Sequence, residues 1–330
     1  MKLCVISTVA QHKFGADLHL KNLLWALEDM DVKILIQTYK SHGLKFEDPR
    51  VSVIEVDSDP SRFFFFWDNN SETIGRFAKD VDFFLFMEQD ILFTDKPTIN
   101  CSFPIQINLH SQYLSIFDDS RRLLYPRIWE GCTFIRSDVV RDALDAGVRF
   151  GSLKNVPKWI VDSVCDYYTT GSALHLDFTK ISDHISRRSF LDTMFEFGLY
   201  CFINKIPYEL KSEDLNYEYG DKVVHFRGCD MIVRDNPMVY ENPEEMHRMS
   251  NNSQTWRRLI NGCAFLFLVS GIYEAESSVA RMIKNKFKKS DTLLCTKLLM
   301  MREKASEWLS EKEIESLDWA ISMLRGPKLL

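Results

Sequence analysis

Residues 81–93 read VDFFLFMEQDILF, and this stretch carries the strongest indication of the fold. Its first seven residues are mostly apolar, a pattern typical of a strand that is buried on both faces of a sheet. The apolar run leads directly into Glu88, Gln89 and Asp90. Ligands of open α/β sheets bind at the carboxyl ends of the strands, so we expect both carboxylates to lie at a binding edge.

The segments around this strand alternate between strand and helix patterns. We predict buried strands over 2–9, 32–39 and 51–56, and helices over 15–30 and 71–80. This order of elements indicates an α/β fold with a Rossmann-like, mainly parallel sheet that is flanked by helices.

The rest of the chain is mixed and then becomes helical. We predict strands over 103–109, 132–136, 200–204 and 223–228, and helices over 137–146 and 183–198, the second ending at Gly198. Residues 254–324 have helical periodicity, two glycines and no proline, which predicts about three helices. We therefore expect an α/β domain over 1–235 and a helical C-terminal region over 236–330.

Composition narrows the class of protein. The chain has 330 residues and a net charge of −6, which disfavours a generally basic nucleic-acid binder. Its eight cysteines include no CxxC pair, so we expect free, buried thiols in a reducing compartment and no cysteine-based zinc site.

The N-terminus is typical of a first strand rather than a signal peptide. The longest apolar run near the C-terminus, 263–269, is too short to cross a bilayer. We expect a soluble, cytoplasmic protein and leave peripheral membrane association open.

Several common motifs are absent from the sequence. It has no GxGxxG after the first strand, no GxxxxGK[ST], no GxSxG and no HExxH. Two carboxylates two residues apart at a strand end can instead hold a hard divalent cation, which takes its other ligands from water and substrate phosphates. A solvated acidic turn is the plainer interpretation of the same residues.

The acidic strand end resembles the D-x-D signature of glycosyltransferases with the GT-A fold, with Glu88 in place of the first Asp. The first strand, 2–9, resembles the family's first nucleotide-binding strand. Three later segments resemble the family's later segments in the same order: 129–138 (WEGCTFIRSD), 183–207 and 223–228 (VVHFRG). The resemblance extends over about residues 2–230.

This resemblance implies a metal-dependent enzyme that moves a sugar from a nucleotide-sugar donor to an acceptor. Mn²⁺ or Mg²⁺ would be bound by Asp90, Glu88 and His225. The donor would contact Thr8, Glu88 and Arg227, and a UDP-sugar is the favoured donor.

The resemblance also suggests where a catalytic base would lie. An inverting transferase needs a carboxylate that takes the proton from the acceptor hydroxyl. Asp183 is our preferred candidate because the matching family segment opens with acids, and Glu130 and Asp192 are alternatives. A retaining reaction would need no such base.

Two other functions and several acceptors stay open. A nucleotidyltransferase also uses carboxylates at a strand end, although its Gly-rich basic loop is missing after the first strand. A non-catalytic carbohydrate-binding module is the third hypothesis. The acceptor could be a glycan, a lipid-linked sugar, a protein or a nucleic-acid base. A basic helix could dock an anionic or carbohydrate acceptor, or could be a solvated face; its basic residues are Arg281, Lys284, Lys286, Lys288 and Lys289.

Overall fold

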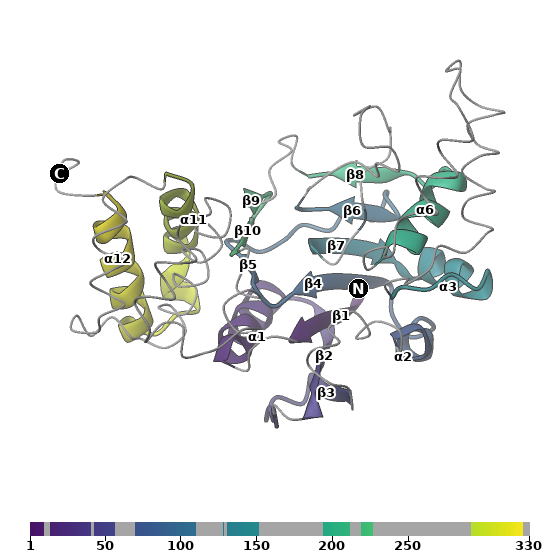
Figure 1. Ribbon diagram of the computed structural model, residues 1–330, viewed down its shortest axis with the longest axis horizontal. Coiled ribbons are helices and arrows are strands. Elements are labelled where there is room, and N and C mark those ends of the chain that lie inside the picture. The colour runs from purple at the N-terminus through teal and green to yellow at the C-terminus, as the bar shows by residue number, and fades with distance from the viewer. Residues whose placement is uncertain are drawn as a thin grey trace, which may run out of the picture.

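A computed structural model describes residues 1–9, 14–40, 43–56, 70–109, 128, 131–151, 194–211, 219–226 and 292–325. Within these ranges the centre is a seven-stranded sheet with the strand order β3-β2-β1-β4-β7-β6-β8 (Figure 1). Its strands are β1 (Lys2–Val9), β2 (Asp31–Tyr39), β3 (Val51–Val56), β4 (Phe83–Glu88), β6 (Ile105–Ile107), β7 (Gly131–Arg136) and β8 (Tyr208–Leu210).

The sheet is mostly parallel, as the sequence predicts. The strands β3, β2, β1 and β4 run in one direction, and β6 and β8 run the same way. Only β7 in this sheet is antiparallel to its neighbours, β4 and β6. Strands buried on both faces of a parallel sheet read as continuous apolar runs, which explains why KLCVISTV and FFLFME form the two central strands.

Helices cover both faces of this sheet. Alternate side chains of β1 point to opposite faces, so Leu3 and Val5 join one core while Cys4 and Ile6 join the other. The helix α1 (Phe14–Ala26) packs in the first core. The second core contains α2 (Asn70–Phe77), α3 (Ser137–Asp145) and α6 (Phe195–Ile203), on the right of Figure 1.

A second, three-stranded antiparallel sheet lies on the α1 side. It has the order β5-β10-β9, with β5 (Ile91–Phe93), β10 (Val223–His225) and β9 (Tyr219–Gly220). Strands of two or three residues are too short for an alternating pattern to show. The sequence therefore predicted β10 as a longer strand over 223–228 and did not predict a separate sheet.

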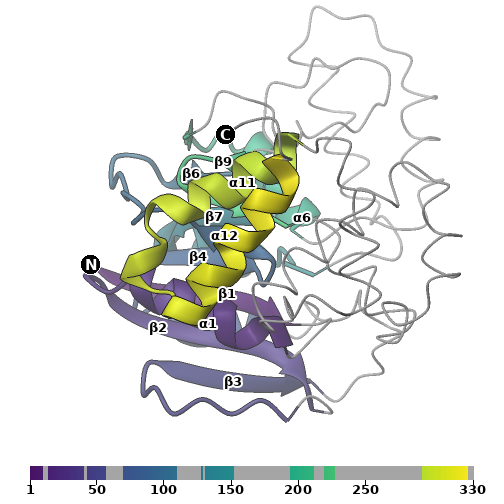
Figure 2. The same cartoon turned by 90° about the vertical axis from the view of Figure 1, so that its left-hand side faces the viewer.

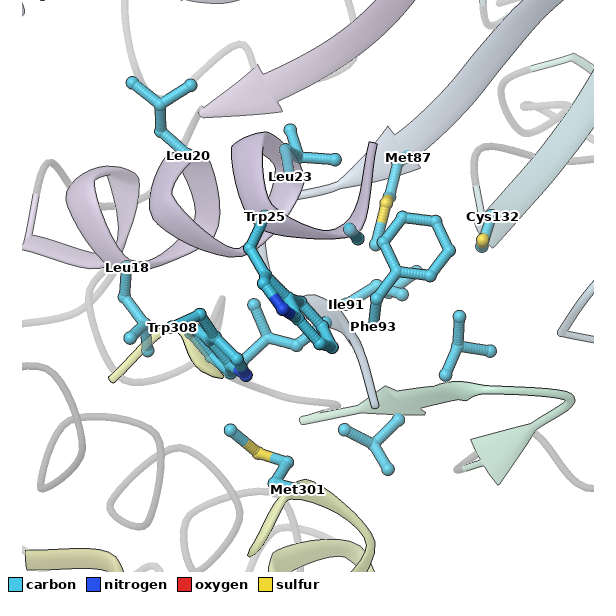
Figure 3. Packing of buried hydrophobic residues seen from close by; sticks show 14 of the residues in the cluster. Leu18, Leu20, Leu23, Trp25, Met87, Ile91, Phe93, Cys132, Met301 and Trp308 are labelled. Carbon is cyan, nitrogen blue, oxygen red and sulfur yellow. The ribbon is translucent and has the colours of Figure 1, made fainter. Parts of the chain in front are cut away.

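The C-terminal helices pack against the same core as α1. They are α11 (Thr292–Glu303), the short 3-10 helix η4 (Ala305–Glu307) and α12 (Glu311–Arg325). Leu294, Leu298 and Leu317 are buried with residues of α1, β5 and β10. Figure 2 shows α11 and α12 lying over α1, and Figure 3 shows Trp308 beside Trp25 of α1. Most of residues 292–324 are thus helical as predicted, while 236–291 lie outside the described residues.

The predictions around Gly198 are wrong. The structure has one helix, α6, that continues through Gly198, where the sequence predicted a helix end and a strand over 200–204. Phe197, Leu199 and Cys201 are all fully buried. Periodicity alone does not distinguish a buried helix from a buried strand in such an apolar run. Residues 183–193 lie outside the described part of the chain.

Candidate metal centre

The structure brings the three predicted metal ligands together at the carboxyl edge of the sheet. Glu88 ends β4, Asp90 lies in the turn to β5, and His225 ends β10. One ligand atom from each lies within 4.8 Å of the others. The Nε2 atom of His225 is 3.8 Å from Oε2 of Glu88 and 3.5 Å from Oδ1 of Asp90.

Backbone pairing between β5 and β10 sets this geometry. Ile91 pairs with His225 in the antiparallel register, so the residue after Asp90 faces the imidazole-bearing residue. The amide of Phe226 donates a hydrogen bond of 2.8 Å to the carbonyl oxygen of Asp90. The acidic turn and His225 are therefore fixed to each other although they are far apart in the sequence.

The spacing of the three side chains fits a divalent cation. Metal–oxygen bonds of about 2.1 Å place two ligand atoms about 3 Å apart at a right angle and about 4.2 Å apart across the metal. The two measured distances, 3.5 and 3.8 Å, lie between these limits and beyond the usual N–H···O bond length. The two carboxylates supply the hard oxygen ligands that suit Mn²⁺ and Mg²⁺, and the imidazole supplies a nitrogen ligand.

The three side chains differ in how exposed they are. The side chain of His225 is 3% exposed and that of Asp90 10%, whereas that of Glu88 is 30% exposed. Of the three side chains, that of Glu88 at the end of β4 is the one through which a bound cation would be reached from solvent. That is the arrangement required of a metal that keeps free positions for phosphate oxygens.

Thr8 lies beside Glu88 at the same edge of the sheet. The parallel registers place Thr8 of β1 between Gln37 of β2 and Glu88 of β4. Thr8 is buried, and within the described ranges its Oγ1 has no hydrogen-bond partner. A buried hydroxyl without a partner is costly, so a ligand that bonds Thr8 would gain from it.

The small sheet is also anchored to the end of β6. The amide of Asp221 donates a hydrogen bond of 3.0 Å to the carbonyl oxygen of Asn108. Gly220 approaches the same carbonyl so closely that a Cβ atom would lie 1.9 Å from its oxygen. Only glycine permits this contact, which helps to hold β9 and its neighbour β10 against the main sheet.

Two buried polar residues of α1 contact β5, and the sequence analysis did not single them out. His19 contacts the carbonyl oxygen of Ile91 and the hydroxyl of Ser7, and Asn22 forms two hydrogen bonds with the backbone of Phe93. Desolvation lowers the pKa of His19 to about 4, so its ring is neutral at pH 7. A His and an Asn three positions apart on an apolar helix face were the signal that could have identified them.

Two buried thiols of the main sheet are not reactive. Cys4 and Cys132 are buried and unpaired. Burial raises the pKa of the Cys4 thiol to about 12 and raises that of Cys132 well above its ordinary value. Both thiols therefore stay protonated at neutral pH and are poor nucleophiles or metal ligands.

Several predicted site residues lie outside the described residues. These are the candidate bases Asp183, Glu130 and Asp192, the predicted donor contact Arg227 and the basic segment 281–289. The structure therefore tests neither the base nor the acceptor site.

Comparison of the sequence with models of known protein families and with curated proteins finds no match. Among the described residues, no helix combines the length and the apolar character that crossing a membrane requires.

Proposed function

We propose that this protein is a metal-dependent glycosyltransferase of the GT-A type that uses a nucleotide-sugar donor, with a UDP-sugar favoured. The observation that carries the proposal is the convergence of Glu88, Asp90 and His225, the three ligands that the family resemblance implies. Glu88 and Asp90 come from the acidic motif, and His225 comes from a different sheet. A solvated acidic turn would not require a buried histidine from a distant segment to meet both carboxylates.

The position of β1 supports the same proposal. β1, which resembles the family's first nucleotide-binding strand, pairs directly with β4, which carries the acidic motif. Because both strands end at the same edge, a donor whose diphosphate reaches the metal ligands would also pass Thr8. We propose that the Thr8 hydroxyl bonds the nucleotide part of the donor.

Each of the three proposed ligands would have its own part in binding the donor. Asp90, Glu88 and His225 would hold Mn²⁺ or Mg²⁺, and the bound cation would neutralise the diphosphate and stabilise the departing nucleotide. The buried His225 and the backbone-paired turn of Asp90 keep two ligands in fixed positions. Glu88, which is more exposed, borders the side from which the substrate would enter.

A nucleotide panel tests this function. UDP-, GDP-, CMP- and dTDP-sugars are added with and without Mn²⁺ while thermal unfolding and sugar release are followed. We expect one nucleotide class to raise the melting temperature only with Mn²⁺, since a ligand at 100 times its Kd stabilises by about 2.7 kcal/mol. Asp90→Asn should abolish this stabilisation and the Mn²⁺-dependent sugar release.

Glu72→Gln is the matched control, because it also neutralises an acid but at an exposed position of α2. It should respond to the nucleotide as the parent does. If no nucleotide-sugar stabilises or is cleaved by the parent protein with either Mn²⁺ or Mg²⁺, the proposal is wrong. Stabilisation that survives in Asp90→Asn would place the donor site elsewhere.

A further inference from the structure

The two edges of β5 are satisfied by different partners. One edge of β5 pairs with β10 in an antiparallel arrangement. There the Phe226 amide donates to the carbonyl oxygen of Asp90, and the Thr94 amide donates to the carbonyl oxygen of Lys222. Hydrogen-bonded pairs alternate along such a ladder, so the polar backbone groups of Ile91 and Phe93 point to the opposite edge. That outer edge faces α1, because side chains of α1 bond the backbone of both residues.

Asn22 of α1 occupies part of this outer edge. Its Nδ2 donates a hydrogen bond of 2.9 Å to the carbonyl oxygen of Phe93, and its Oδ1 accepts one of 2.7 Å from the Phe93 amide. A side-chain amide presents an N–H donor beside a carbonyl acceptor, as a peptide strand does along its edge. Asn22 therefore bonds Phe93 as a residue of a neighbouring strand would.

His19 occupies the rest of the edge and continues to the main sheet. Its Nδ1 lies 3.2 Å from the carbonyl oxygen of Ile91, which can only accept, so Nδ1 carries the ring proton. Nε2 of the neutral ring then accepts a hydrogen bond of 2.7 Å from the hydroxyl of Ser7 in β1. This series of hydrogen bonds links β1, α1 and β5 next to the turn that carries Asp90.

We propose that His19 and Asn22 are positioning residues for the metal centre. This inference rests on the proposed metal site and goes beyond it. Both side chains are fully buried and bond the backbone of β5. They hold β5, and β5 in turn sets Asp90 and, through β10, His225. Outer residues that orient metal ligands typically change metal affinity by about 10–100-fold when they are removed.

Mn²⁺ titration followed by electron paramagnetic resonance tests the proposal, because the signal of free Mn²⁺ reports binding without activity. His19→Leu and Asn22→Leu remove the polar contacts to β5 at similar volume, and we expect each to raise the Kd for Mn²⁺ about 10–100-fold. His19→Asn should recover most of the affinity, since an Asn amide nitrogen can reach the position of Nδ1 and donate to Ile91.

Leu23→Ala is the matched control. Leu23 lies in the same helix and is fully buried, but it makes no side-chain hydrogen bond to β5. We expect it to lower the melting temperature while leaving the Kd for Mn²⁺ at the parent value.

The outcomes separate the two proposals. Suppose that the parent protein binds Mn²⁺ and that the folded variants His19→Leu, Asn22→Leu and His19→Asn all bind it equally well. This outcome would overturn the positioning role alone. A loss of affinity in Leu23→Ala equal to that in Asn22→Leu would do the same, because general destabilisation would then explain both. Parent protein that binds no Mn²⁺ would overturn the metal centre and the positioning role together.

Discussion

The imidazole of His19 is enclosed by β1, α1 and β5, and its neutral form is what these surroundings require. Ser7 donates to one ring nitrogen, and the carbonyl oxygen of Ile91 accepts from the other. A second ring proton would have no acceptor at Ser7 unless the hydroxyl turned away. Burial outweighs the nearby negative charge of Asp90, which acts in the opposite direction on the pKa.

This neutral histidine predicts that acid destabilises the protein. The His19 pKa is about 4 in the folded protein, against an ordinary value of 6.5 that applies to the unfolded chain. Between these values the unfolded chain binds a proton that the folded protein does not, so the stabilisation present above pH 6.5 is lost as the pH falls. In urea unfolding without metal, the titration of His19 should lower the free energy of unfolding by an amount on the order of 2 kcal/mol between pH 7 and pH 5.

His19→Asn provides the comparison for this effect. It cannot titrate, while every other ionisable group is unchanged. Its unfolding free energy should therefore fall less than that of the parent over the same pH interval. Equal losses in the two proteins would show that His19 is not the acid-sensitive group.

At the scale of elements, a pair of tryptophans joins α1 to the C-terminal helices. The rings of Trp25 and Trp308 stack with centroids 5.7 Å apart and planes inclined by 22°, and both residues are buried (Figure 3). The Nε1 of Trp25 also donates to a carboxylate oxygen of Glu307 at 3.2 Å. The exposed pair Lys21–Glu313 bridges the same two parts of the chain.

We expect the stack, not the ion pair, to stabilise this junction. A double-mutant cycle of Trp25→Ala and Trp308→Ala, measured by urea unfolding, should give a coupling of about 0.5–1.5 kcal/mol. Each single variant should lose about 3–5 kcal/mol. Lys21→Gln should change stability by less than about 1 kcal/mol because its side chain is 42% exposed. A coupling near zero would mean that the two rings stabilise the fold independently.

The elements differ in how well the sequence predicts them. β4 and β1 are long apolar runs, which few structures other than a buried strand satisfy, and both were predicted close to their observed bounds. The run around Gly198 is equally apolar and no shorter, so its local pattern does not separate a helix from a buried strand. In the structure it forms a helix whose Phe197 stacks on Phe150 in the second core.

At the scale of the whole molecule, the candidate metal centre lies where the main sheet meets the small sheet. α1 supports β5 from one side, and α11 packs against β10, with Nζ of Lys297 lying 5.9 Å from the ring centroid of Phe226. Residue spacing predicted Glu88 and Asp90, because both follow one strand. His225 came from the family resemblance, since no local pattern connects it to the acidic turn.

His19 and Asn22 could not be assigned from the sequence for a different reason. Their partners are backbone groups of β5, and any sequence without proline at 91–93 offers the same groups. A polar pair on an apolar helix face indicates that the two side chains form buried hydrogen bonds. Only the fold shows that their partners are in β5, the strand that follows Asp90.

Anomalous diffraction from crystals grown with Mn²⁺ and UDP tests the central claim most directly. Data collected on either side of the manganese absorption edge locate the metal without reference to activity. The account predicts one strong manganese peak bonded to Oδ of Asp90, Oε of Glu88 and Nε2 of His225, with the diphosphate on its open side. A manganese peak bound elsewhere, or UDP bound with no metal among these three side chains, would contradict it.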